Sequence, residues 1–100
     1  MSRVIFSIQY DIFPEKRNDY VSVIKELKNL VMGDGLDSYS VYEFKGKPNS
    51  FEEIYIYDSK EAWENSDENI DERVDILMTK LSDMIKEKST KYNTLFELDS

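Results

Sequence analysis

Hydrophobic and polar residues alternate in four short segments of this chain, and two longer segments have the period of a helix. The alternating segments are rich in β-branched and aromatic residues and predict strands at 3–10, 36–45, 51–57 and 91–99. Apolar residues at every third or fourth position predict one helix with Pro14 in its first turn and a second helix capped by Ser66. Between the third strand and the second helix, the capping-box spacing of Asp58-Ser59-Lys60-Glu61 predicts a short helical turn that carries Trp63.

The predicted order is β-α-β-β-α-β, without an internal repeat or a long linker, so residues 1–100 are expected to form one domain. This order is typical of the ferredoxin-like α+β fold. In that fold a four-stranded antiparallel sheet carries two helices on one face.

Apolar residues occur on both faces of the predicted strands. Val4, Phe6 and Ile8 alternate with Ile5, and the pair Ile54 and Ile56 alternates with three aromatic residues, Phe51, Tyr55 and Tyr57. Two helices can cover only one face, and an open apolar sheet tends to associate. We therefore expect a homodimer packed sheet to sheet; the alternative is that scattered apolar side chains remain in contact with water.

The net charge of −8 changes the range of expected partners because it is concentrated in one segment. Residues 52–75 contain ten acidic and two basic residues, and the rest of the chain is balanced. Nucleic acids and anionic membranes are therefore not expected as partners. No segment is apolar enough to span a membrane, and the start "MSRVIFSIQY" has no signal-peptide pattern, so we expect a cytoplasmic protein.

Two residue types are missing, and their absence limits the chemistry. The chain has no cysteine, so it forms no disulfide and has no thiol nucleophile. It also has no histidine, the usual general base near neutral pH and the commonest metal ligand. Asp67, Asp71 and Asp75 recur one helical turn apart and could approach a cation, but no glycine-containing acidic loop accompanies them. A solvated helix face is the favoured interpretation, and no metal site is predicted.

The order of elements, with "GLDSYSVYEFK" and then "EEIYIYDSKEAWENS", resembles the antibiotic-biosynthesis-monooxygenase-like domains of the dimeric α+β barrel superfamily. The local resemblance is a strand that ends in an aromatic residue, followed by acid-Ser-x-Glu-Ala-aromatic, here 57–63. It implies a ferredoxin-like subunit whose sheet pairs with that of a second copy to form a barrel. It also implies oxygenation of a small phenol- or quinol-like aromatic substrate without a cofactor.

The resemblance implies a site between the sheet and the helices. Gln9 would correspond to a polar amide on the first strand, and Tyr57 to an aromatic residue at the end of the third; both are candidate catalytic residues. Ser7, Tyr55 and Trp63 are candidate substrate-binding residues. In this arrangement Ile5, Ser7, Gln9, Tyr55 and Tyr57 face the helices, and the barrel interior is filled by Val4, Phe6, Ile8, Ile54 and Ile56.

Two classes of function remain open. The first is a cofactor-independent monooxygenase-like enzyme in which Gln9 binds a substrate oxygen and Tyr57 stacks on the ligand or transfers a proton. The second is a non-catalytic dimeric module that binds a small molecule or a protein partner, with the acidic segment 52–75 as a recognition surface. In the second case the tyrosines fill volume in the core and Trp63 anchors the corner after the third strand.

Overall fold

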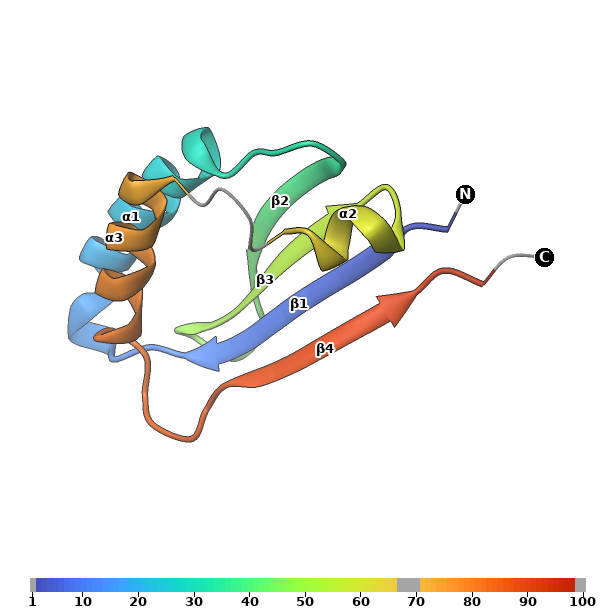
Figure 1. The fold of residues 1–100 in the computed structure, drawn as a ribbon. Helices are drawn as coiled ribbons and strands as arrows, with labels where there is room; N and C mark the ends of the chain where they lie inside the picture. Colours follow the sequence, from blue (N-terminus) through green and yellow to red (C-terminus); the bar gives the residue numbers. More distant parts are fainter. Residues whose placement is uncertain (1, 67–70, 99–100) are drawn as a thin grey trace.

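A computed structural model describes residues 2–66 and 71–98 of the chain (Figure 1). The strands are β1 (Val4–Asp11), β2 (Leu36–Glu43), β3 (Ser50–Tyr57) and β4 (Lys91–Phe96). The helical elements are a 3-10 turn η1 (Pro14–Lys16), α1 (Arg17–Leu30), α2 (Lys60–Glu64) and α3 (Glu72–Ser82). The predicted β-α-β-β-α-β order is confirmed, with α2 as the predicted short turn.

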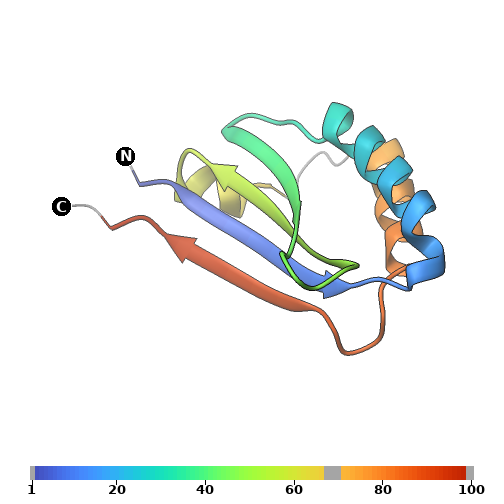
Figure 2. The same ribbon diagram turned by 180° about the vertical axis from the view of Figure 1, so that it is seen from behind.

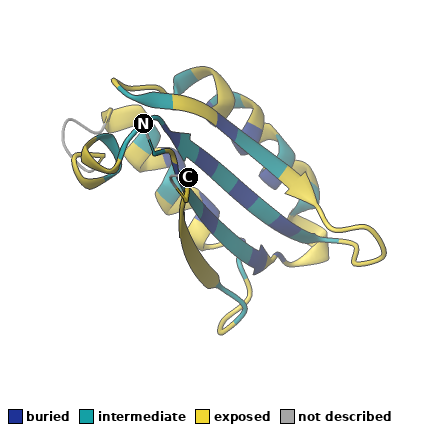
Figure 3. Cartoon of the chain, turned by 90° about the vertical axis from the view of Figure 1, so that its right-hand side faces the viewer, coloured by how far each residue is buried: buried dark blue, intermediate teal, exposed yellow. Residues whose placement is uncertain are grey.

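The four strands form one antiparallel sheet in the order β2-β3-β1-β4. This order places β1 and β3 at the centre, as in the ferredoxin-like fold. α1 and α3 lie side by side at one end of the sheet, and α2 lies near the other end (Figures 1 and 2). β4 pairs only with β1, and all six of its residues are exposed, whereas buried and intermediate residues alternate along β3 (Figure 3).

The helices are held on the sheet by the apolar stripes that the sequence predicts. α1 buries Tyr20, Val23, Ile24 and Leu27. α3 buries Leu77 and Leu81. Removing these side chains from water supplies the main force that joins the helices to the sheet. None of the described helices is both long and apolar enough to cross a membrane.

The predicted start of the second long helix at Ser66 is wrong. The Ser66 hydroxyl instead donates a hydrogen bond to the carbonyl of Trp63, at 2.6 Å, just after α2 ends. α3 begins six residues later, where the Asp71 carboxylate accepts a hydrogen bond from the Arg73 N–H at 2.7 Å. Serine and aspartate are both good N-caps, so residue type alone does not decide whether the helix is capped by Ser66 or by Asp71. Ile70, the first residue of the predicted apolar stripe, lies outside the described residues.

α2 is fixed against the start of β2 by a glycine. Gly35 has a positive φ of 83°, and its carbonyl accepts a hydrogen bond from the Asp58 N–H at 2.7 Å. A Cβ atom at Gly35 would lie 2.4 Å from the Cβ of Ala62, so only glycine allows α2 to approach this closely. The Ser59 hydroxyl then caps α2 by accepting a hydrogen bond from the Ala62 N–H. These contacts set the position of Trp63.

Candidate functional site

The strand register places Gln9 and Tyr57, the two candidate catalytic residues, on opposite faces of the sheet. Cα partners in an antiparallel pair point to the same face. Val4 is opposite Tyr57 and Phe6 is opposite Tyr55, so these four side chains share one face. The Tyr20 ring of α1 packs on the rings of Tyr10 and Phe51, which belong to the same set of alternate positions. This is therefore the helix-facing side of the sheet.

Gln9 and Ser7 lie on the other face, opposite Glu52 and Ile54. The Gln9 side-chain amide donates a hydrogen bond to Glu52 at 3.1 Å, and Ser7 is buried between its neighbours on the central strand. The predicted grouping of Gln9 and Ser7 with Tyr55 and Tyr57 is thus wrong. Ile54 and Ile56 do lie on the open face as expected, but Val4, Phe6 and Ile8 lie under the helices.

Tyr55 and Tyr57, two of the predicted site residues, belong to a larger group of aromatic rings on the helix-facing side. Tyr39 on β2, Tyr55 on β3, Phe6 on β1 and Tyr92 on β4 form a continuous row across all four strands. Neighbouring ring centroids are 4.8 Å, 5.9 Å and 6.2 Å apart along this row. We call it the aromatic row. The Tyr57 ring lies parallel to that of Tyr55, with centroids 6.4 Å apart, and so extends the row at its centre.

One end of the aromatic row is open to solvent. Tyr39 and Tyr55 are buried, but Tyr92 is 68% exposed. The Trp63 ring meets Phe96 edge to face at 5.7 Å, and the Lys60 ammonium lies 4.7 Å from the centre of the same Phe96 ring. Trp63 therefore does border an uncovered aromatic surface on β4, and at the same time anchors α2 to that strand.

The structure adds a residue that the sequence analysis missed. Glu53 is 3% exposed and lies on the helix-facing side between Phe51 and Tyr55. Its cross-strand neighbours are Ile8 and Val41, so apolar side chains flank the carboxyl. The Tyr39 hydroxyl donates a hydrogen bond to Glu53 Oε1 at 2.6 Å.

The environment of Glu53 raises the pKa of its carboxyl. Burial raises the pKa of the carboxyl, and hydrogen bonding by the Tyr39, Tyr10 and Tyr55 hydroxyls partly offsets this increase. Burial, and then the nearby Glu53 charge, also raises the pKa of Tyr10, Tyr39 and Tyr55. These phenols consequently remain protonated donors at neutral pH.

A second phenol pair extends this network towards α1. The hydroxyls of Tyr10 and Tyr20 are 2.8 Å apart and buried, and either can donate. Burial raises the pKa of the Tyr20 hydroxyl as well. We call Glu53 with Tyr10, Tyr20, Tyr39 and Tyr55 the Glu53–tyrosine cluster. A signal for it exists in "FEEIYIY", where Glu53 is in phase with the three aromatic residues of β3.

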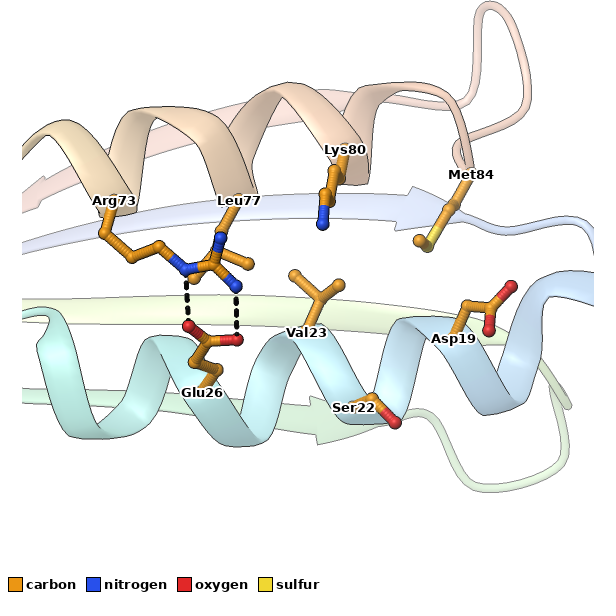
Figure 4. Close-up of a pocket in the computed structure, with 8 residues that line it drawn as sticks. All are labelled: Asp19, Ser22, Val23, Glu26, Arg73, Leu77, Lys80 and Met84. Atoms are coloured by element: carbon orange, nitrogen blue, oxygen red, sulfur yellow. Dashed lines mark hydrogen bonds and ion pairs between the residues drawn. The ribbon is translucent and has the colours of Figure 1, made fainter.

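A separate cavity of about 350 Å³ lies between α1 and α3 (Figure 4). At one end Arg73 forms a two-pronged ion pair with Glu26, with N–O distances of 2.6 Å and 2.9 Å. The remaining lining residues are Asp19, Ser22, Val23, Leu77, Lys80 and Met84. No member of the Glu53–tyrosine cluster lines this cavity.

The acidic residues of the second half do not form a metal site in the part of the chain that is described. Within residues 2–66 and 71–98, no group of three or more histidine, cysteine or acidic side chains is placed to hold a metal ion. Asp71 serves as the cap of α3, and Asp67 lies outside the described residues. The buried carboxyl of Glu53 has phenols, and not other carboxylates, as its polar neighbours.

The sequence matches no protein-family model and no curated protein. Solved structures, however, share its fold. SnoaB, a cofactor-independent oxygenase from Streptomyces nogalater, has 12% sequence identity and a TM-score of 0.75, over 98% of this chain and 95% of its own. A conserved protein from Methanosarcina mazei Go1 has 17% identity and a TM-score of 0.78, over 95% and 92%. An antibiotic biosynthesis monooxygenase has 17% identity and a TM-score of 0.70, over 100% and 98%.

The chain therefore shares its fold with solved structures that include a cofactor-independent oxygenase and an antibiotic biosynthesis monooxygenase. At identities this low the comparison defines the fold, and the activity has to be argued from the site.

Proposed function

We propose that the chain forms a homodimer and acts as a cofactor-independent monooxygenase-like enzyme on a small, planar, phenol- or quinol-like substrate. The aromatic row is the observation that carries this proposal. It gives a flat ligand a stacking surface that begins at the exposed Tyr92 and leads to the buried Tyr39 hydroxyl. The fold that the chain shares with a cofactor-independent oxygenase supports the same class of reaction.

The dimer supplies the cover for the open face of the sheet. Ile5, Ile54, Ile56 and Leu95 lie on this face, opposite the side that the helices cover. The Leu95 side chain is 56% exposed in a single subunit, so this face of the outer strand has no cover there. A second copy that presents the same face would bury these side chains symmetrically.

The reaction needs no electron donor beyond its substrate. For an anthrone-type substrate, the reactive CH2 carbon gives up four electrons and becomes a second ring carbonyl. Molecular oxygen accepts them: one atom enters the product and the other leaves as water with the two hydrogens. The protein would hold the ring, remove a proton to create an electron-rich anion and keep that anion oriented towards oxygen.

Oxygen uptake by the purified protein with anthrone tests the proposal. Tyr92→Ala should lower kcat/KM by about tenfold, because loss of one stacking ring costs about 1.4 kcal/mol. Tyr42→Ala is the matched control: Tyr42 is also exposed, but its partner Glu52 places it on the opposite face. Gln9→Ala should leave the rate unchanged for the same reason.

Oxygen uptake and a separate measurement of ligand binding together distinguish the two classes of function. Trp63 is the only tryptophan, and its ring contacts Phe96, which lies on β4 four residues from Tyr92, so quenching of its fluorescence reports a ligand bound along this strand. Quenching by anthrone without oxygen uptake above the buffer rate would favour a non-catalytic binding module. Oxygen uptake that Tyr57→Phe leaves unchanged would remove the Tyr57 hydroxyl from the reaction and leave its ring as a lining group.

A further inference from the structure

We infer that Glu53 is the proton acceptor of this site and takes the proton of a bound phenolic ligand through the hydroxyl of Tyr39. The inference rests on the proposed function for its substrate class, but not on oxygenation itself. Its basis is the buried position of the Glu53 carboxyl and its hydrogen bond with the Tyr39 hydroxyl.

The site contains one group suited to the task. The chain has no histidine, and the phenols of the Glu53–tyrosine cluster are held protonated by burial. Glu53 is the carboxyl on the helix-facing side next to the aromatic row, between Ile8 and Val41. Sheet positions with such neighbours are normally apolar, because a buried carboxyl that forms too few hydrogen bonds is costly. A carboxyl in apolar surroundings also holds a proton more firmly than one in water.

Tyr39 connects this carboxyl to the ligand surface. Glu53 and Tyr39 are both buried, at 3% and 8% exposed, and the Tyr39 ring lies 4.8 Å from that of Tyr55 in the aromatic row. The Tyr39 hydroxyl donates its hydrogen to Glu53 Oε1 at 2.6 Å. Its oxygen still has lone pairs with which to accept a hydrogen bond from a ligand hydroxyl.

The transfer is balanced in charge and atoms. The ligand hydroxyl gives its proton to the Tyr39 oxygen while the Tyr39 proton moves to Glu53 Oε1. The ligand keeps the electron pair of its O–H bond and becomes a phenolate, Glu53 becomes neutral and Tyr39 is unchanged. During turnover, the proton returns through Tyr39 to the reduced oxygen atom that leaves as water.

The groups that face Glu53 set the pH range of this transfer. They are Tyr10 from β1, Tyr20 from α1, Tyr39 from β2 and Tyr55 from β3, and no lysine or arginine is among the groups that shift the Glu53 pKa. Tyr39 acts here as the catalytic contact. Tyr10 and Tyr55 also hydrogen-bond to the carboxyl, and Tyr20 holds Tyr10 through the contact between their hydroxyls.

A hydroxyanthraquinone dye tests the inference without turnover, because its phenol and phenolate differ in colour. Bound to the wild-type protein, the dye should show its phenolate colour while Glu53 keeps the transferred proton, so that no proton is released to the solution, whereas formation of the bound phenolate in Glu53→Gln should release one proton per dye. Tyr39→Phe should behave like Glu53→Gln, and Glu53→Asp should partly restore the wild-type result. Glu52→Gln, on the neighbouring residue and the opposite face, should match the wild type.

The outcomes separate this inference from the proposed function. Equal proton release in the wild type and Glu53→Gln, with binding confirmed by Trp63 quenching, would overturn the role of Glu53. Failure of the dye to bind the wild type would overturn both proposals. Proton release that depends on Glu53, in a protein with no oxygen uptake, would support proton acceptance and reject only the oxygenase. With oxygen uptake, Glu53→Gln should lower kcat by at least about 100-fold.

Discussion

The hydroxyl of Tyr39 lies 2.6 Å from Oε1 of Glu53, and both side chains are buried beneath the helices. This contact joins an edge strand to a central strand through their side chains as well as through the backbone ladder. A buried carboxyl is tolerated only when donors reach it, so the two residues are expected to depend on each other. The pair is therefore part of the stability of the sheet as well as of the candidate site.

Removing the donor should destabilise the protein. Tyr39→Phe keeps the ring against Tyr55 but leaves Glu53 without its closest hydrogen bond, which should cost about 1–3 kcal/mol at neutral pH. Urea unfolding at fixed protein concentration measures this. Tyr42→Phe, on the same strand but 59% exposed and on the opposite face, should change stability by less than about 0.5 kcal/mol. Equal effects of the two substitutions would show that the hydroxyl of Tyr39 contributes nothing.

The pH dependence of stability should reveal the buried carboxyl. The pKa of Glu53 is raised above its ordinary value of 4.5, so the folded state binds the proton more tightly than the unfolded state. The resulting stabilisation is complete below pH 4.5 and is lost as the pH rises through the folded-state pKa, at up to about 1.4 kcal/mol per pH unit. Glu53→Gln should lack this loss, so its stability relative to the wild type should increase as the pH rises.

Unfolding midpoints at several pH values above 4.5 test this sign. Glu52→Gln should keep the wild-type dependence, because Glu52 lies on the other face and bonds to Gln9. Parallel curves for the wild type and Glu53→Gln would show that Glu53 does not titrate with a raised pKa.

Two glycines allow strain to be separated from crowding. Gly35 and Gly46 have almost the same positive φ, 83° and 82°, but a Cβ at Gly35 meets Ala62 and Asp58, while one at Gly46 meets nothing within 4 Å. Gly46→Ala should cost about 1 kcal/mol from the backbone alone. Gly35→Ala should cost at least about 2 kcal/mol and should change the emission of Trp63, because α2 must move. Equal costs in thermal unfolding would contradict the close approach of α2.

The sequence was sufficient for the fold because alternation and helical period are local properties. The faces of each strand, the stripe of α1 and the turn that carries Trp63 were all predictable from neighbouring residues. The pairing of faces between strands was not, because it depends on register. A shift of one residue between β1 and β3 would pair Gln9 with Phe51 or Glu53, in phase with Tyr55 and Tyr57, whereas the observed register pairs it with Glu52 on the opposite face.

Glu53 shows a second limit of local interpretation. Glu53 lies within the acidic segment 52–75, and the local sign of its burial is that it shares a phase with the aromatic residues of β3. Its hydrogen-bond partner Tyr39 and the nearby Tyr20 lie far from it in the sequence and come close to it only in the folded protein. Long-range contacts of this kind define the site.

The proposed dimer can be tested on the open face without disturbing the core. Leu95 lies on this face of the outer strand, opposite Ile5, and is largely exposed in a single subunit. Leu95→Asp should therefore leave the subunit folded but place a desolvated charge twice in a symmetric interface. Loss of about 1.5–3 kcal/mol per leucine predicts a dimer dissociation constant at least about 100-fold higher.

Sedimentation over a range of concentrations, with circular dichroism as a check on folding, measures the effect of Leu95→Asp. Ile76→Asp provides the control, because Ile76 is also an exposed apolar residue but lies on α3, away from the open face. The control should sediment like the wild type. A wild type that remains folded and monomeric at micromolar concentration would exclude the dimer, because the open face would then be stable in contact with water.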